Sequence, residues 1–384
     1  MRLHEYQAKS IFSNHGIRVP RGKLAKNLEE VRKIVEELGE EVVLKAQVLT
    51  GGRGKAGGIK KAKSAEEAIE HSKNMFGKNI KGLTINKIYI EELIEVEREL
   101  YLGFTYDGLN KSIVMLISTF GGMDIEDIAA QHPEKIIRKT IDPLIGFWDF
   151  LIREALYELE IPKKFFKPIA SIAKKLYRVF IDYEAELCEI NPLAITKDGD
   201  ICALDARLNI DDDALYRNPD FIKLKDYSQM EPLERTAEEK GLKYVKLSGD
   251  IGLIAAGAGM GMATADYIHN FGGNPANFFD IGGATPEIVK KSFELLLQDS
   301  RLKVIFVNVL GGLTRCDWIA KGLIEAFNDL KVRLPVVIRL SGTNEYEGRE
   351  ILIRHIQEND LKGVFIVESM EEGAKKAVEI SKGG

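Results

Sequence analysis

The chain has 384 residues, of which 45% are hydrophobic and 29% are charged, and its formal net charge is −5. This composition is typical of a globular protein, and the length suggests two or three domains. The negative charge argues against a general nucleic-acid surface, and no apolar run reaches the roughly 18 residues that a membrane-spanning helix needs.

The N-terminal segment and the cysteines indicate where the protein works. Met1–Tyr6 enters an amphipathic pattern at once and has neither a signal-peptide core nor an acid-free leader. Cys188, Cys202 and Cys316 are odd in number and lack zinc-site spacing, so we expect reduced thiols. Both features favour the cytoplasm.

The first half of the chain mixes helix and strand signals irregularly. A helix is expected over 27–38, ended by Gly39, and another after the capping box Ser64–Glu67, closed by Gly77. Periodicity predicts strands at 42–47, 87–91, 99–105 and 113–118, helices near 148–159 and 165–180, and a β-rich return over 186–208.

The second half is regular. Residues 211–241 lack a core-forming run, so we place a domain boundary near residue 235, giving domains 1–235 and 236–384. Beyond the boundary, apolar strands alternate with helices that follow glycine-rich turns, which predicts a doubly wound parallel sheet with its ligand crevice at the carboxyl ends of the strands. The expected strands are 251–256, 278–281, 304–309, 336–340 and 364–367.

A basic, glycine-rich segment runs from Thr50 to Ile59. Its five glycines within residues 51–58 allow close backbone approach and offer N–H groups to anionic oxygens. Arg53 and Lys55 add positive charge, and Lys45 lies just upstream on an expected strand. The segment is not a Walker loop, and it predicts a phosphate cradle between two strands. The alternative is a flexible hairpin with a solvated basic tip.

A second candidate site lies in Glu186–Leu193. Strand alternation places Glu189 and Asn191 on one face, and antiparallel pairing with residues 201–207 would bring Asp205 beside Asn191. An amide oxygen and a carboxylate suit Mg²⁺, which a nucleoside triphosphate requires. The alternative is a polar strand face with a turn at Asn191.

Three acidic residues, Glu91, Glu92 and Glu99, lie on strands that follow the glycine-rich loop. Carboxylates among phosphate-binding cations are suited to hydrogen-bond a ribose or an adenine amino group. The alternative is that these three glutamates lie on solvent-exposed strand edges and bind no nucleotide.

Together these segments resemble the β subunits of succinyl-CoA synthetase over essentially the whole chain. The shared blocks are Leu3–Lys9, Gly51–Gly58, Glu99–Gly103, Glu189–Leu193, Leu204–Leu208, Pro275–Phe278, Gly311–Gly312 and Arg315–Asp317. The resemblance implies an α/β protein with an N-terminal ATP-grasp domain and a C-terminal flavodoxin-like domain. It also implies the reversible conversion of a nucleoside triphosphate, succinate and CoA to succinyl-CoA, nucleoside diphosphate and phosphate.

The resemblance also implies roles for matching residues. Asn191 and Asp205 would bind Mg²⁺, and Glu189 would steady a phosphohistidine. The acid would face Ala256 and a helix start at Gly312, Leu313 and Thr314, whose N–H groups favour anions. ATP or GTP would contact Lys45, Gly52, Arg53, Gly54, Glu91, Ile94 and Glu99.

In this family the phosphohistidine and the CoA site belong to a separate α subunit, so we expect an αβ or α2β2 assembly. The histidines of this chain agree with that division, because none lies in a glycine-rich turn. We therefore expect the isolated chain to form no stable phosphohistidine.

Three positions depart from the family pattern. Phe120 and Ser341 stand where the family usually has Glu, and Ala256 stands where it usually has Asn. Because the family's Asn lies near the acid, malate– and citrate–CoA ligases of the same architecture remain alternatives to succinate–CoA ligase.

Two other classes of function compete with that of a ligase subunit. Gly257–Gly261 followed by Asp280 resembles a dinucleotide-binding fingerprint, which would indicate an oxidoreductase, but the third glycine is misplaced. A non-catalytic nucleotide binder is the other rival, and the intact pair of Asn191 and Asp205 argues against it.

Overall fold

The computed structural model describes residues 1–39 and 41–383, and these form two compact units, Met1–Gln229 and Met230–Gly384. Residues 40 and 384 fall within the two predicted domains but lie outside the described residues. The predicted boundary near residue 235 falls within helix α7 (Pro232–Glu239), close to the division between the units. No helix among the described residues is both long and apolar enough to cross a membrane.

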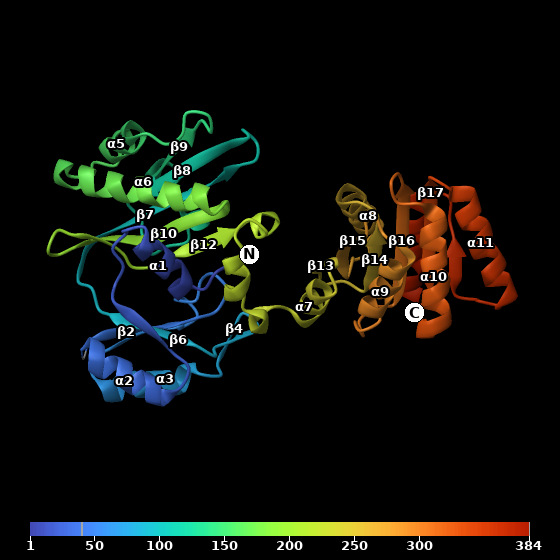
Figure 1. The fold of residues 1–384 in the computed structure, drawn as a ribbon, viewed down its shortest axis with the longest axis horizontal. Coiled ribbons are helices and arrows are strands. Elements are labelled where there is room, and N and C mark those ends of the chain that lie inside the picture. The colour runs from blue at the N-terminus through green and yellow to red at the C-terminus, as the bar shows by residue number, and fades with distance from the viewer. Residues whose placement is uncertain (40, 384) are drawn as a thin grey trace. The chain divides into compact units, whose positions relative to one another are not determined.

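The first unit contains a small antiparallel sheet, and α2 (Leu28–Leu38) and α3 (Ala65–Met75) cover one of its faces (Figure 1). Each helix starts beside a capping side chain, because Asn27 accepts from Glu30 N–H, and Ser64, the predicted cap, accepts from Glu67 N–H. In spatial order the strands are β1 (Gly22–Ala25), β6 (Ile88–Glu92), β2 (Val42–Ala46) and β3 (Ile59–Ala62).

A larger antiparallel sheet completes the first unit. Its apolar face packs against α1 (Glu5–Asn14), α5 (Asp149–Glu158) and α6 (Phe166–Asp182) in one core. Its strands are β11 (Ile201–Ala203), β10 (Ala185–Thr196), β7 (Val96–Asp107), β8 (Ser112–Ser118) and β9 (Ile136–Ile141), with β12 (Arg207–Ile210) also pairing with β10. Outside the two sheets lie the β4–β5 hairpin (Asn79–Ile80 and Leu83–Thr84) and the short helix α4 (Ile125–Gln131).

The second unit is the predicted parallel, doubly wound sheet. Taken without the antiparallel edge strand β13 (Lys243–Lys246), its spatial order is second, first, third, fourth, fifth, which is the flavodoxin-like order. In chain order the parallel strands are β14 (Ile251–Ala255), β15 (Asn277–Asp280), β16 (Val304–Gly311), β17 (Val336–Gly342) and β18 (Val364–Ile366).

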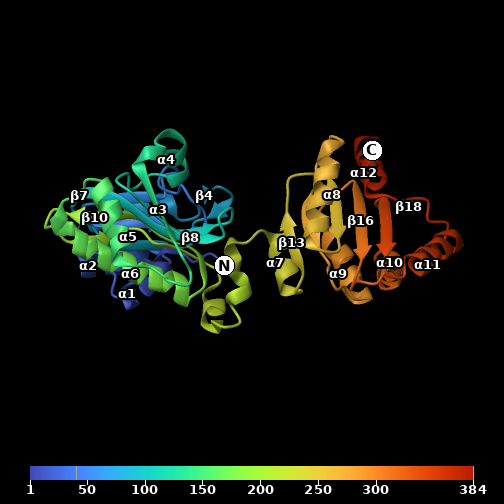
Figure 2. The same ribbon diagram turned by 90° about the horizontal axis from the view of Figure 1, so that it is seen from above.

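Helices cover both faces of this sheet (Figure 2). Alternate residues of β16 face opposite cores: Ile305 and Val307 lie in one, and Val304 and Phe306 in the other. One face is covered by α8 (Ala258–Asn270) and α12 (Met370–Gly383), and the other by α9 (Pro286–Leu296), α10 (Cys316–Leu330) and α11 (Glu345–Glu358).

The helices α1 and α4 were not predicted from the sequence, nor were several strands: β1, β3, β4, β5, β9 and β13. These are short or polar strands; β3, for example, reads Ile-Lys-Lys-Ala and has two exposed lysines. The predicted continuous run 201–207 is also wrong. It divides into β11 and β12, which residues 204–206 link, although Leu204 N–H still donates to Pro192 O of β10.

Candidate functional site

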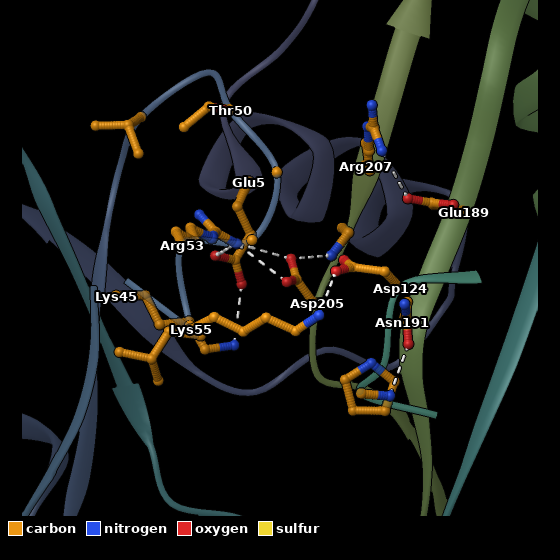
Figure 3. Close-up of a pocket in the computed structure, with 18 of the residues that line it drawn as sticks. Glu5, Lys45, Thr50, Arg53, Lys55, Asp124, Glu189, Asn191, Asp205 and Arg207 are labelled. Carbon is orange, nitrogen blue, oxygen red and sulfur yellow. Dashed lines mark hydrogen bonds and ion pairs between the residues drawn. The ribbon is translucent and has the colours of Figure 1, made fainter. Parts of the chain in front are cut away.

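A pocket of about 420 Å³ opens in the first unit between the glycine-rich loop and the β10 face (Figure 3). Of the residues predicted from the sequence, it brings together Lys45, Gly52, Arg53, Gly54, Glu99, Glu189, Asn191 and Asp205. Glu91 and Ile94 do not line it: Glu91 is buried on β6, and Ile94 lies on the link between β6 and β7.

The glycine-rich loop connects β2 and β3, which pair antiparallel with Lys45 opposite Ile59. It folds back on itself through hydrogen bonds from Gly57 N–H to Gly54 O and from Gly58 N–H to Arg53 O. A Cβ at Gly58 would lie 3.0 Å from Arg53 O, so a side chain there would crowd the closure. The loop is therefore a folded connection between two paired strands, which agrees with the predicted strand-linking position, although Lys55 at its tip is exposed.

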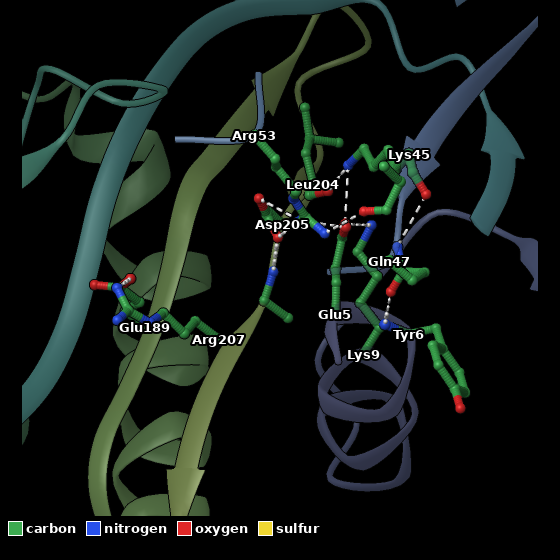
Figure 4. A network of polar contacts seen from close by, with 12 residues as sticks. Glu5, Tyr6, Lys9, Lys45, Gln47, Arg53, Glu189, Leu204, Asp205 and Arg207 are labelled. Carbon is green, nitrogen blue, oxygen red and sulfur yellow. Dashed lines mark hydrogen bonds and ion pairs between the residues drawn. The ribbon is translucent and has the colours of Figure 1, made fainter. Parts of the chain in front are cut away.

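Lys45 is buried and bound on several sides (Figure 4). Its Nζ lies 2.7 Å from Glu91 Oε1 and 3.0 Å from Glu5 Oε1, and it donates to Leu204 O. Burial disfavours the charged amine, but attraction to Glu5 and Glu91 outweighs burial and raises the pKa of Lys45. Lys45 is thus a permanent cation at the pocket wall, and Glu91 is not the solvated strand edge considered above.

Glu5, on the first turn of α1, joins three cations. Its carboxylate lies 2.8 Å from Lys9 Nζ, and it also pairs with Lys45 and Arg53. Burial alone would raise the pKa of Glu5, but these cations hold it well below its usual range. This role of Glu5 was not predicted from the sequence, although Glu5 and Lys9 stand at the i, i+4 spacing within the shared block Leu3–Lys9.

Arg53 crosses from the glycine-rich loop to Asp205. Its Nη2 lies 3.0 Å from Asp205 Oδ1 and 3.1 Å from Oδ2. Burial opposes the charge on Arg53, but Glu5 and Asp205 raise the pKa of its guanidinium. Arg53 thus pairs with the carboxylate of Asp205, the residue that was predicted from the sequence to bind a metal.

Glu189 and Asn191 share one face of β10, as predicted. Asn191 Oδ1 accepts from Gly122 N–H at 2.7 Å, and its Nδ2 donates to Met123 O at 2.7 Å. Asp205 lies in the link between β11 and β12, and it lines the same pocket as Asn191. The two predicted metal ligands therefore share one cavity, although not through continuous strand pairing.

These two residues fit a hard cation in their chemistry. The Asp205 carboxylate and the Asn191 amide supply oxygen ligands, which Mg²⁺ prefers, and nucleotide phosphates commonly complete its shell. Among residues 1–39 and 41–383 there is no cluster of three His, Cys, Asp or Glu side chains arranged for a metal. A metal here would thus need ligands other than a cluster of carboxylate, thiolate and imidazole groups.

Glu189 is held by two residues that the sequence analysis did not single out. Tyr101 Oη donates to Glu189 Oε2 at 2.7 Å, and Arg207 Nη1 donates to Oε1 at 3.3 Å. Burial raises the pKa of Glu189, against the lowering effect of both hydrogen bonds.

At the pocket mouth, Lys55 pairs with Asp124 at 2.7 Å and with Asp127 at 3.0 Å.

In the second unit, the residues predicted to bind the acid lie where parallel strands end. Ala256 follows β14, and Gly312, Leu313 and Thr314 form a bend after β16. Thr314 Oγ1 accepts from Gly283 N–H at 2.7 Å, whereas Leu313 is 97% exposed. Helix α10 starts at Cys316, so the bend precedes the helix start instead of forming it.

The fingerprint for a dinucleotide cofactor does not fit this unit. Asp280 Oδ1 accepts from Gly257 N–H at 2.7 Å and from Gly282 N–H at 2.8 Å, so this carboxylate ties two turns together. The flavodoxin-like strand order also differs from the dinucleotide-binding order.

Comparisons with known proteins agree with this division. Residues 2–195 match the ATP-grasp domain model, and residues 254–379 match the CoA-ligase model. The chain is 57% identical over 383 residues to the ADP-forming succinate–CoA ligase subunit beta 2 of Archaeoglobus fulgidus, with 100% of both chains covered. It is 45% identical over 381 residues to the corresponding subunit beta of Bacteroides thetaiotaomicron, with 99% of this chain and 100% of the relative covered.

Among solved structures, the chain resembles an ATP citrate lyase from Methanothrix soehngenii, with a TM-score of 0.74, 19% identity and 100% of both chains covered. At that identity the likeness supports the fold alone.

Proposed function

The chain belongs to the family of ADP-forming succinate–CoA ligase β subunits, and we propose that it is the subunit that binds nucleotide, Mg²⁺ and succinate in such a ligase. The proposed reaction converts a nucleoside triphosphate, succinate and CoA to succinyl-CoA, nucleoside diphosphate and phosphate. The observation that carries it is one pocket in which Glu189, Asn191 and Asp205 lie across from the folded glycine-rich loop and its Arg53.

The proposed nucleotide site lies under this loop. Lys45 and Arg53 would face phosphate oxygens, with backbone N–H groups of Gly52 and Gly54. Glu99 lines the pocket and is suited to a ribose or base. The buried Glu91 acts in this proposal by holding Lys45, and Ile94 remains a proposed contact from the strand link.

The proposed metal ligands are Asn191 and Asp205. A bound Mg²⁺ supplies charge neutralisation for the triphosphate. Arg53 would compete with the metal for both oxygens of Asp205, and a guanidinium that the metal displaces is available to a phosphate.

The phosphoryl group is proposed to pass to a histidine of an α subunit, which also carries the CoA site. All six histidines of this chain are described, and none lines the pocket. Glu189 would accept a hydrogen bond from the imidazole of the phosphohistidine and so steady it. The proposed assembly is a cytoplasmic αβ dimer or α2β2 tetramer.

The acid is proposed to bind in the second unit, near Ala256 and the Gly312–Thr314 bend. Ala256, with Phe120 and Ser341, is where the sequence departs from the family pattern, so malate– or citrate–CoA ligase is the second candidate.

The test is co-expression with the α-like subunit and measurement of CoA-dependent ADP release with succinate, malate or citrate. We expect succinate to give the highest kcat/KM. Labelled ATP should leave acid-labile label on the α subunit and none on this chain alone. Lys45→Ala should weaken nucleotide use, whereas Lys60→Ala, which changes an exposed lysine on β3, should not. Acid-labile label on the isolated chain would refute the division of roles.

A further inference from the structure

We propose that Tyr101 is a positioning residue that fixes the Glu189 carboxylate for its hydrogen bond to the phosphohistidine, and that Gly103 provides the gap through which it does so. This inference rests on the role proposed above for Glu189. It adds two residues of β7 to the site, neither of which lines the pocket.

The register of the large sheet creates this arrangement. Glu189 on β10 lies directly opposite Gly103 on β7. Tyr101 stands two residues along β7 and therefore projects from the same face as residue 103. Its hydroxyl passes over Gly103 to reach Glu189 Oε2 at 2.7 Å.

Position 103 favours glycine because a side chain there would meet Tyr101 and Glu189. Its backbone does not adopt a positive φ, so the conformation itself does not demand glycine. A Cβ at this position would lie 2.7 Å from Tyr101 Oη and 3.2 Å from Glu189 Cβ. Any side chain would thus push the hydroxyl and the carboxylate apart.

The two oxygens of Glu189 have different surroundings. Tyr101 is 1% exposed, so the hydrogen bond to Oε2 comes from a side chain in the protein interior. Oε1 is turned to Arg207, whose side chain is 44% exposed. The carboxylate can therefore offer Oε1 toward the pocket without rotating, and a fixed acceptor avoids the ordering cost that a mobile one incurs when the imidazole arrives.

The alternative is that Tyr101 merely satisfies a buried hydroxyl and stabilises the fold. A double-mutant cycle separates the two, because a residue that acts only through Glu189 loses its effect once Glu189 can no longer accept as a carboxylate. A purely structural residue keeps its effect in both backgrounds.

The experiment uses the αβ complex and compares Tyr101→Phe, Gly103→Ala, Glu189→Gln and the double variant Tyr101→Phe/Glu189→Gln. Tyr106→Phe is the matched control, since Tyr106 lies on the same strand and is 54% exposed. The readouts are thermal unfolding, Mg·ADP affinity and the single-turnover rate of phosphohistidine formation.

We expect Tyr101→Phe and Gly103→Ala to slow phosphohistidine formation about tenfold, the equivalent of losing one hydrogen bond to a charged group, with Mg·ADP affinity unchanged. In the Glu189→Gln background, adding Tyr101→Phe should not slow phosphohistidine formation further. The Tyr106→Phe control should form phosphohistidine at the wild-type rate. If Tyr101→Phe does not fold, Gly103→Ala tests the same contact.

An impaired Glu189→Gln beside an unimpaired Tyr101→Phe and Gly103→Ala would overturn this inference and leave the proposed function standing. Full phosphorylation in Glu189→Gln would refute the role of Glu189 itself, and the inference with it. Additive effects in the double variant would assign Tyr101 a structural role only.

Discussion

The Nζ atom of Lys45 on β2 lies 3.0 Å from Oε1 of Glu5 on α1, although 40 residues separate them in the chain. This contact belongs to a buried network in which the cations Lys9, Lys45 and Arg53 face the carboxylates Glu5, Glu91 and Asp205. The charges balance, so the cations of the pocket are held in place before any ligand arrives, and a triphosphate must compete with carboxylates for them.

Glu5→Gln should test the centre of this network. Removing one member of a buried ion pair leaves uncompensated charge and costs about 3 kcal/mol. We expect a loss of that order in the free energy of unfolding, measured with urea at pH 7. Glu29→Gln, which changes an exposed glutamate on α2, should cause little loss.

The destabilising effect of Glu5→Gln should depend on pH. The pKa of Glu5 is lowered on folding, so its stabilisation is present above the unfolded-state pKa and is lost as pH falls through the folded-state pKa. The stability gap between wild type and Glu5→Gln should therefore narrow below about pH 4.5. A gap that stays constant into acid would contradict the assignment of Glu5 as the ionised centre.

Asp205→Asn should weaken metal-dependent nucleotide binding. The substitution keeps the shape of the side chain but removes the charge and one of the oxygens that a divalent cation needs. We expect at least a roughly tenfold loss of Mg·ADP affinity by calorimetry, equivalent to ~1.4 kcal/mol. Asp198→Asn, in the exposed turn after β10, is the control. Unchanged Mg·ADP affinity in Asp205→Asn would refute the metal assignment.

Arg53→Gln should move two affinities in opposite directions. Arg53 holds both oxygens of Asp205, so its removal should strengthen Mn²⁺ binding to the nucleotide-free chain, measured by electron paramagnetic resonance. It should also weaken Mg·ADP binding, because a phosphate loses its guanidinium partner. Lys60→Gln should change neither affinity. If both affinities fell together, Arg53 would not be competing with the metal.

Local patterns account for the part of the site that was predicted from sequence. The density of glycines marked the loop after Lys45, and two-residue alternation placed Glu189 and Asn191 on one face. Alternating strands and helices likewise predicted the doubly wound sheet, whose strand order confirms the flavodoxin-like class.

The missed residues depend on long-range pairing. Glu5 reaches Lys45 across two elements, and Tyr101 reaches Glu189 because strand register sets Gly103 between them. The pattern of β7 alone does not show which of its residues lie opposite Glu189, because β10 is far away in the chain. The same limit explains the wrong continuous strand at 201–207, where Asp205 sits in a break in the pairing.

Ala256→Asn tests the choice of acid. Ala256 lies half-buried between the end of β14 and Gly257, whose φ of 98° starts the turn into α8. An amide there adds a hydrogen-bond donor for a carboxylate, which is worth about tenfold in affinity. We expect steady-state kinetics of the αβ complex to show a lower KM for succinate. The KM for nucleotide should stay unchanged, because its proposed ligands belong to the other unit. If succinate KM stayed constant while citrate or malate kinetics changed, the pocket would favour one of those acids, and the second candidate function would replace the first.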